Sequence, residues 1–291
     1  MFRGCRERGE PNRGASVRLQ APGFSGLAQP FSIATRHVKG VWLVRFLIAG
    51  NWKMNGSRPM LVELDRIAEA ARTAPSVDVA IAPPFTLLAD AAPRAGAVML
   101  GGQDCHPAAQ GAHTGAISAG MLVEMGARFV ICGHSERRAE FGESDSLIQA
   151  KAAAAQAVGL IACVCVGEDE PERDAGQAIM VVAAELDGSV PPASTGANLV
   201  ISYEPAWAIG TGRTPTCAEI SEMHGMIRAK LIQLLGEEGA KVRILYGGSV
   251  TPDNAGSILA CDEVNGALIG GASLTADKFG AIIRVAADIA Q

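Results

Sequence analysis

From Val44 to the C-terminus, short apolar runs alternate with longer segments in which apolar residues recur every three or four positions. The short runs have the length of buried strands, and the longer segments have the period of amphipathic helices. The runs expected to form strands are Val44–Asn51, Val77–Ala82, Val98–Gln103, Phe129–Gly133, Leu160–Val166, Leu199–Tyr203, Arg243–Tyr246 and Gly266–Ile269. Regular alternation of this kind predicts a parallel sheet built from βα units.

Helix signals between the apolar runs agree with this pattern. Thr216-x-x-Glu219 has the form of a capping box, in which two side chains satisfy free backbone N–H groups of the first helical turn. Gly236 stands where that helix would end, because glycine readily adopts the left-handed conformation common after a helix. Thr251–Pro252 pairs an N-cap residue with the proline favoured at the first helical position, and predicts another helix start.

Eight βα units within about 250 residues match the usual size of a closed (β/α)8 barrel. An open doubly wound sheet is the competing architecture, but it usually carries a glycine-rich fingerprint after its first strand. Here that position has Gly50-Asn51-Trp52-Lys53. We therefore predict an α/β protein with a single catalytic domain, an eight-stranded parallel (β/α)8 barrel over residues 44–291.

Residues 1–43 are rich in arginine and lack hydrophobic periodicity. An organelle transit peptide would have this basic, serine-containing composition, although Glu7, Glu10 and Pro11 weaken any amphipathic helix. The other interpretation, which we favour, is an upstream stretch that is not translated, with the true start near Val44. Residues 1–43 are therefore expected to be either a poorly ordered N-terminal extension or a stretch upstream of the true start.

Composition and charge exclude several classes of protein. Hydrophobic residues make up 48% of the chain and charged residues 19%, which suits a globular protein. The formal net charge of −5 provides no basic surface for nucleic acid, and no apolar run reaches the roughly 18 residues of a membrane-spanning helix. Seven cysteines without a CxxC pair, in a chain with no secretory signal, predict reduced thiols and a cytoplasmic protein.

The sixth expected strand ends in a carboxylate. In a (β/α)8 barrel the carboxyl ends of all strands meet at one face, and that face holds the active site. Glu204 stands at this end, and Pro205 restricts it to extended geometry. Gly210-Thr211-Gly212 gives the following loop freedom to close as a lid. A Glu-Pro strand exit is more often solvated than catalytic, so its interpretation as a base depends on its neighbours.

A histidine and a lysine follow two other expected strands. His134 stands where a short helix could begin, and a helix N-terminus favours a neutral imidazole that donates a hydrogen bond. Lys53 lies in an apolar segment, where its charge calls for an anionic partner such as a phosphate or an enediolate. Alone, each would be explained as a structural histidine or a solvated lysine. Together with Glu204 they suit proton abstraction beside a carbonyl.

Glycine-rich loops follow the last two expected strands, as Gly247-Gly248-Ser249 and Gly270-Gly271. Backbone amides in such loops can turn towards one anion, and barrels frequently bind phosphate in the loops after strands seven and eight. With the amides of the predicted lid, these loops predict a small phosphorylated substrate.

Four segments resemble the signature segments of the triosephosphate isomerase family and occur in the family's order. They are GNWKMNG at 50–56, GHSERR at 133–138, YEPAWAIGTG at 203–212 and YGGSV at 246–250. The resemblance implies a TIM barrel that interconverts dihydroxyacetone phosphate and glyceraldehyde 3-phosphate, a step of glycolysis and gluconeogenesis, without metal or organic cofactor. A catalytically idle phosphate-binding barrel, or an isomerase or epimerase of another sugar phosphate, would be the alternatives.

The resemblance also implies roles for the residues at the matching positions. Glu204 would move the proton between two carbons. His134 would polarise the carbonyl and move protons between the oxygens. Lys53 would stabilise negative charge, Asn51 would help to hold the oxyanion, and Glu136 would support the polar network near Lys53. The backbone amides implied to bind phosphate are those of Gly210, Ser249, Gly270 and Gly271.

A homodimer is implied as well, through the long polar loop Gln103–Ile117, with Thr114 reaching the neighbouring active site. Unsupported loops of this length are usually functional or disordered. The loop departs from the family at His113, where an aromatic residue is common, and at Ala116, where glutamate is usual. These departures affect the expected strength of the dimer.

Overall fold

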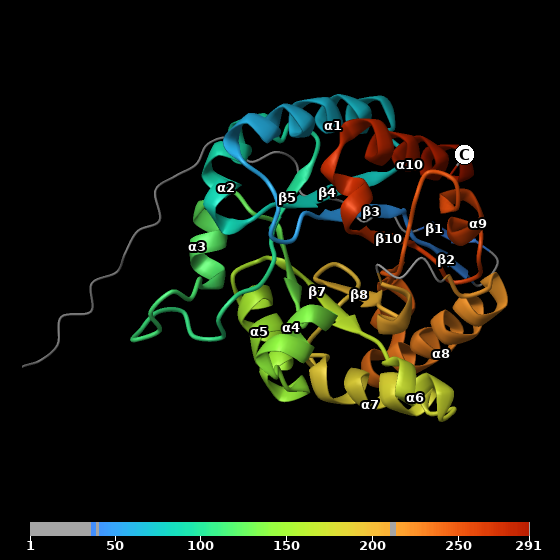
Figure 1. Ribbon diagram of the computed structural model, residues 1–291. Coiled ribbons are helices and arrows are strands. Elements are labelled where there is room, and N and C mark those ends of the chain that lie inside the picture. The colour runs from blue at the N-terminus through green and yellow to red at the C-terminus, as the bar shows by residue number, and fades with distance from the viewer. Residues whose placement is uncertain (1–35, 39–40, 210–213, 291) are drawn as a thin grey trace, which may run out of the picture. The chain divides into compact units, whose positions relative to one another are not determined.

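The computed structural model describes residues 36–38, 41–209 and 214–290, and within them eight parallel strands close into a barrel in the order β10-β3-β4-β5-β6-β7-β8-β9 (Figure 1). The barrel strands are β3 (Leu47–Asn51), β4 (Asp78–Ala82), β5 (Met99–Gly102), β6 (Phe129–Cys132), β7 (Ile161–Val166), β8 (Leu199–Tyr203), β9 (Arg243–Tyr246) and β10 (Gly266–Ile269). Each falls within one of the eight predicted runs, so the predicted (β/α)8 barrel is confirmed.

Helices connect the strands and surround them (Figure 1). The α-helices are α1 (Leu61–Thr73), α2 (Phe85–Ala91), α3 (Ala119–Glu124), α4 (Ser135–Phe141), α5 (Asp145–Ala157), α6 (Glu170–Asp174), α7 (Ala178–Ser189), α8 (Cys217–Leu235), α9 (Ala255–Leu259) and α10 (Ala276–Ile289). The short 3-10 helices are η1 (Arg58–Met60), η2 (Ala92–Arg94), η3 (Ala206–Ala208), η4 (Gly236–Lys241) and η5 (Gly271–Leu274). None of the described helices is long and apolar enough to cross a membrane.

The core lies between the strands and the surrounding helices. Leu64 and Ile67 of α1, three residues apart, and Phe279 and Ile283 of α10, four residues apart, are each 0% exposed. Burial of each such side chain contributes about 1.5 to 3 kcal/mol to stability, and this holds the helices against the barrel.

The helix signals were right at α8 and wrong at α9. At α8, Thr216 and Glu219 form both bonds of the capping box, and Gly236 after its last residue has a φ of 62°. At α9, Thr251–Pro252 lies in a turn, and the helix begins only at Ala255. The side chain of Asn254 accepts a hydrogen bond from the Thr251 backbone N–H at 2.7 Å, which stabilises the turn. This local bond outweighs the helix preference of the Thr-Pro pair.

Two short strands lie ahead of the barrel. β1 (Arg36–Val38) and β2 (Val41–Leu43) pair as an antiparallel hairpin in a region where no regular structure was predicted. The rest of the predicted N-terminal extension, residues 1–35 and 39–40, lies outside the described residues. Its assignment as an extension stays a prediction.

The cysteines are only partly as predicted. Cys105, Cys132, Cys163 and Cys165 are buried free thiols, the last two in β7. Cys217 and Cys261 instead form a disulfide, so the prediction of reduced thiols is wrong for this pair. The bond joins the first residue of α8 to the segment after α9, and nearby the Asp262 N–H donates to Ser221 Oγ at 3.0 Å.

Removal of this disulfide is expected to lower stability. It closes a loop with a sequence separation of 44 residues, and the chain entropy that it removes from the unfolded state corresponds to about 4 kcal/mol. Replacement of Cys261 by serine should therefore lower the urea midpoint of the oxidised protein. As a control, a phosphine reductant should lower the midpoint of the parent and leave that of the variant unchanged. Equal midpoints for oxidised parent and variant would contradict the prediction.

Candidate active site

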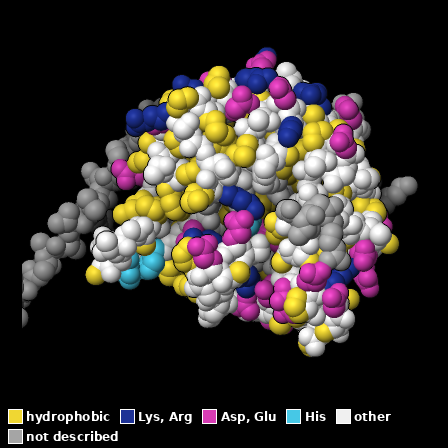
Figure 2. Space-filling view, viewed as in Figure 1, with side chains coloured by type: hydrophobic (Ala, Val, Ile, Leu, Met, Phe, Trp, Pro, Cys, Tyr) yellow, Lys and Arg dark blue, Asp and Glu magenta, His cyan; other side chains and the backbone are white. Residues whose placement is uncertain are grey.

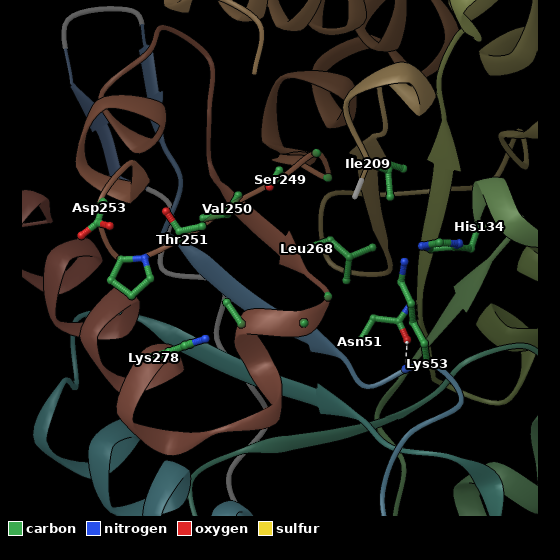
Figure 3. Close-up of a pocket in the computed structure, with 16 residues that line it drawn as sticks. Asn51, Lys53, His134, Ile209, Ser249, Val250, Thr251, Asp253, Leu268 and Lys278 are labelled. Atoms are coloured by element: carbon green, nitrogen blue, oxygen red, sulfur yellow. Dashed lines mark hydrogen bonds between the residues drawn. The ribbon is translucent and has the colours of Figure 1, made fainter. Parts of the chain in front are cut away.

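A cavity of about 560 Å³ opens at the carboxyl ends of the strands (Figure 3). Its walls come from the segments that follow β3, β6, β8, β9 and β10, which are far apart in the sequence. The lining residues are Asn51, Lys53, His134, Ile209, the segment 247–253, Leu268, the segment 270–272 and Lys278. The barrel therefore brings Asn51, Lys53, His134, Ser249, Gly270 and Gly271 together at one site.

Glu204 directly follows β8 and lies just behind this cavity. It is 1% exposed, and its Oε2 accepts a hydrogen bond from the Ser135 backbone N–H at 2.9 Å. No described residue donates to its Oε1. Gly247 allows the segment after β9 to pass close by, since a Cβ atom there would lie 2.7 Å from Glu204 Cγ. The carboxylate is not among the residues that line the cavity.

His134 links the cavity to this carboxylate. It is the N-cap residue of α4, so a helix begins there as the sequence predicted. Its Nδ1 accepts a hydrogen bond from the Glu136 backbone N–H at 3.2 Å. The neutral ring therefore carries its proton on Nε2, which lies 3.7 Å from Glu204 Oε1. The imidazole can thus donate a hydrogen bond towards the cavity.

Lys53 is held in an unusual backbone conformation. Its φ of 53° is in the left-handed region, which costs a residue with a side chain about 1 to 3 kcal/mol. Asn51 Oδ1 accepts from the Lys53 N–H at 2.9 Å, and Gln103 Nε2 donates to the Lys53 carbonyl at 2.9 Å. The ammonium group pairs with Glu136 Oε1 at 2.6 Å. Neighbouring side chains therefore fix both the backbone and the charge of Lys53.

Sequence reasoning missed the role of Gln103. Its side chain also donates to the Ala82 carbonyl at 2.9 Å, so it connects the ends of β3, β4 and β5 through hydrogen bonds. The signal was present, because Gln103 is a polar residue at the end of an otherwise apolar run.

Ser249, Gly270 and Gly271 form the end of the cavity predicted to hold phosphate. Gly270 packs beside Lys53, because a Cβ atom added to Gly270 would lie 3.4 Å from Lys53 Cε. The 3-10 helix η5 begins directly afterwards, at Gly271. The Lys53 side chain therefore lies beside this glycine-rich loop. The fourth predicted amide, that of Gly210, lies outside the described residues.

Glu168 is a second residue that sequence reasoning missed. It follows β7, is 0% exposed, and accepts hydrogen bonds from Tyr203 Oη at 3.0 Å and Trp207 Nε1 at 2.9 Å. Arg173 pairs with it at 3.3 Å. Burial and this nearby carboxylate raise the pKa of Tyr203 well above its usual value. Through the hydrogen bond from Trp207 Nε1, the Glu168 carboxylate anchors Trp207 just before the predicted lid. The position of Glu168 after a predicted strand was a signal in the sequence for this role.

Thr114 does not reach the cavity of its own chain. It belongs to the segment 109–116, whose residues are all exposed, in the loop after β5 that projects away from the barrel (Figure 1). Glu136 also lies outside the cavity wall and acts on it only through its contact with Lys53.

Fold and site together define the protein as a (β/α)8 barrel that holds a buried carboxylate, an imidazole and an ammonium group at the carboxyl ends of its strands. A model of the triosephosphate isomerase family matches residues 46–286. The chain belongs to the triosephosphate isomerase family.

The sequence similarity to individual relatives extends over nearly the whole length of those proteins. The chain is 52% identical to triosephosphate isomerase of Bradyrhizobium diazoefficiens over 83% of this chain and 97% of that protein. It is 55% identical to the Afipia carboxidovorans enzyme over 82% and 96% of the two chains. Among solved structures, triosephosphate isomerase from Bartonella henselae matches with a TM-score of 0.78 and 46% identity, over 83% of this chain and 99% of that one.

Proposed function

We propose that Glu204 is the proton carrier of this isomerase and that His134 is its electrophile. The protein interconverts dihydroxyacetone phosphate and D-glyceraldehyde 3-phosphate. Glu204 takes a proton from the carbon beside the carbonyl, the C–H electron pair forms the C=C bond of an enediolate, and the carbonyl oxygen becomes negative. His134 moves the hydroxyl proton of the first carbon to the negative oxygen. The C=C electron pair then takes the proton back from Glu204 at the neighbouring carbon, and the first carbon becomes the new carbonyl.

The geometry around Glu204 carries this proposal. A buried carboxylate oxygen without a hydrogen-bond donor among the described residues lies 3.7 Å from the Nε2 of a histidine that lines the cavity. The Ser135 N–H holds the other oxygen at 2.9 Å. In the proposed mechanism this bond is released when the Glu204 side chain rotates towards the substrate. A hydrogen bond from Nε2 to the substrate oxygen would stabilise the charge that develops there.

Lys53, Asn51 and Glu136 complete the proposed polar network. The Lys53 ammonium group would face the developing negative charge, while Asn51 holds the Lys53 backbone through its 2.9 Å hydrogen bond and helps to hold the oxyanion. Glu136 positions the ammonium group through the 2.6 Å ion pair. The amides of Ser249, Gly270 and Gly271 would bind the phosphate, with Gly210 closing over it. The proposed mechanism uses no metal or organic cofactor.

A coupled assay of the purified protein with either triose phosphate tests the function. Turnover with both substrates and conversion of one to the other at a fixed equilibrium ratio are expected. The intact set of Glu204, His134 and Lys53 argues against an idle phosphate-binding barrel, which would bind substrate without converting it. A panel of larger sugar phosphates tests the remaining alternative, an isomerase or epimerase of another sugar phosphate. We expect the protein to show no comparable turnover with any of them.

We also propose that the protein works as a homodimer through Gln103–Ile117, with Thr114 entering the site of the partner. Residues 109–116 are all exposed in this loop, and Met54, next to Lys53, is 97% exposed. Figure 2 shows hydrophobic side chains on the surface beside the histidines that project from the molecule. Exposed apolar side chains near an active site are typical of a surface that a partner covers.

Replacement of Met54 by arginine is expected to weaken this dimer, because a charged side chain would have to be desolvated in the apolar contact. Light scattering should show a shift from dimer to monomer, with a loss of activity at low protein concentration. Val62→Arg, an exposed apolar position on α1, is the control and should leave the mass unchanged. A parent protein that is monomeric and fully active would refute the dimer proposal.

We further propose that residues 44–291 form the catalytic unit, that residues 1–43 are dispensable for activity, and that the protein acts in the cytoplasm. Four buried free thiols support a reducing compartment, whereas the Cys217–Cys261 disulfide is unusual for one. A chain beginning at Val44 that keeps full turnover would support the first two points. Mass spectrometry after rapid alkylation of cells would show whether the pair is oxidised there.

A further inference from the structure

Two charged side chains stand at the end of the cavity away from the acid–base residues. Lys278, in the first turn of α10, and Asp253, in the turn before α9, are exposed and both line the cavity. In Figure 3 they lie on the opposite side of the view from His134 and Lys53. The ammonium group of Lys278 points towards the side that holds His134 and Lys53. None of the proposed reaction steps uses either residue.

Neither charge has a direct ion-pair partner in the described part of the chain. The neighbouring residue Asp277 pairs with Arg66 at 2.5 Å, and Lys53, the other lysine of the cavity, pairs with Glu136 at 2.6 Å. Lys278 is thus a cation at the cavity wall, and no described carboxylate forms an ion pair with it. The cavity that Lys278 lines also contains Ser249, Gly270 and Gly271, the residues proposed to bind phosphate.

The substrate is an anion and the protein carries a formal net charge of −5, so the phosphate is repelled at long range. A cation at the mouth of a cleft offsets this repulsion and raises the rate at which anions enter. The Debye length falls from about 30 Å at 0.01 M salt to about 3 Å at 1 M, so such guidance is lost at high ionic strength. A nearby carboxylate has the opposite effect.

We propose that Lys278 guides the phosphate group of the substrate into the cavity and that Asp253 opposes it. Lys278 is not a catalytic residue, because it acts before the substrate meets Glu204 and His134. It affects kcat/KM and leaves kcat unchanged. The proposal rests on the proposed phosphate site at Ser249, Gly270 and Gly271, since the guided group must end there.

The test compares Lys278→Gln, Lys278→Glu and Asp253→Asn with the parent, at about 0.01 M and about 0.5 M salt. At low salt kcat/KM for triose phosphate should fall about twofold for Lys278→Gln and about fourfold for Lys278→Glu, and rise about twofold for Asp253→Asn. At high salt the four proteins should converge. Lys230→Gln is the matched control, because Lys230 lies on α8, pairs with Asp187 at 2.8 Å and does not line the cavity.

Glyceraldehyde, which lacks the phosphate, is the second substrate. Its kcat/KM should be equal for all variants at both salt concentrations. An equal loss with glyceraldehyde, a change independent of salt, or a loss rather than a gain for Asp253→Asn would overturn the guidance proposal. Failure of the underlying phosphate site would be distinct, since inorganic phosphate would then not compete with triose phosphate in the parent protein.

Discussion

Replacement of Glu204 by glutamine is expected to lower kcat at least about 10³-fold, which corresponds to about 4 kcal/mol of transition-state stabilisation. Glutamine has nearly the same shape, but its amide cannot accept the proton that the reaction removes from carbon. The Ser135 N–H, which donates to Glu204 Oε2 at 2.9 Å, can still donate to the amide oxygen, so the fold should remain intact. Steady-state kinetics with both triose phosphates would measure the loss.

Two companion variants make this result specific. Glu204→Asp keeps the carboxylate but withdraws it by one methylene, so it should retain more activity than the glutamine variant and still fall well below the parent. Glu222→Gln changes an exposed carboxylate on α8 that does not line the cavity, and should leave kcat unchanged. Retention of more than about a tenth of the activity by Glu204→Gln would rule out Glu204 as the base.

The strands and most positions around the cavity could be predicted because their signals are local. Each buried strand is an apolar run, and in a (β/α)8 barrel every strand must deliver its next residue to the same face. Lys53 and His134 could therefore be placed at one site from sequence, although about 80 residues separate them along the chain. The capping box of α8 was equally local, since Thr216 and Glu219 are three residues apart.

Features that depend on contacts between distant segments could not be predicted in this way. Nothing in the sequence pairs Cys217 with Cys261, whose closeness follows from the packing of α8 beside the end of α9. Gln103 fixes the Lys53 backbone only because the ends of β3 and β5 approach each other around β4. The position of Glu204 behind the cavity wall likewise depends on the Ser135 N–H of another βα unit.

Replacement of Lys53 by methionine is expected to lower kcat/KM about 10² to 10³-fold, because it removes the positive charge that we propose to stabilise the enediolate. Methionine keeps much of the volume and the apolar stem. The Asn51 and Gln103 hydrogen bonds to the backbone of residue 53, both 2.9 Å, do not involve the lysine side chain and should preserve the local fold. Triose phosphate kinetics, together with thermal unfolding of the variant, would measure the effect.

The Glu136→Gln variant distinguishes the effect of the Lys53 charge on activity from the effect of how that charge is positioned. This change removes the carboxylate that pairs with the ammonium group at 2.6 Å but leaves the ammonium group in place. The Glu136 side chain is 53% exposed, so water can replace part of the lost interaction, and a loss of less than about tenfold is expected. A loss as large as that of Lys53→Met would show that the ammonium group acts only when this carboxylate holds it. A Lys53→Met variant with unchanged kcat/KM would instead remove Lys53 from the mechanism, because charge stabilisation would then have to come from His134 and the backbone amides alone.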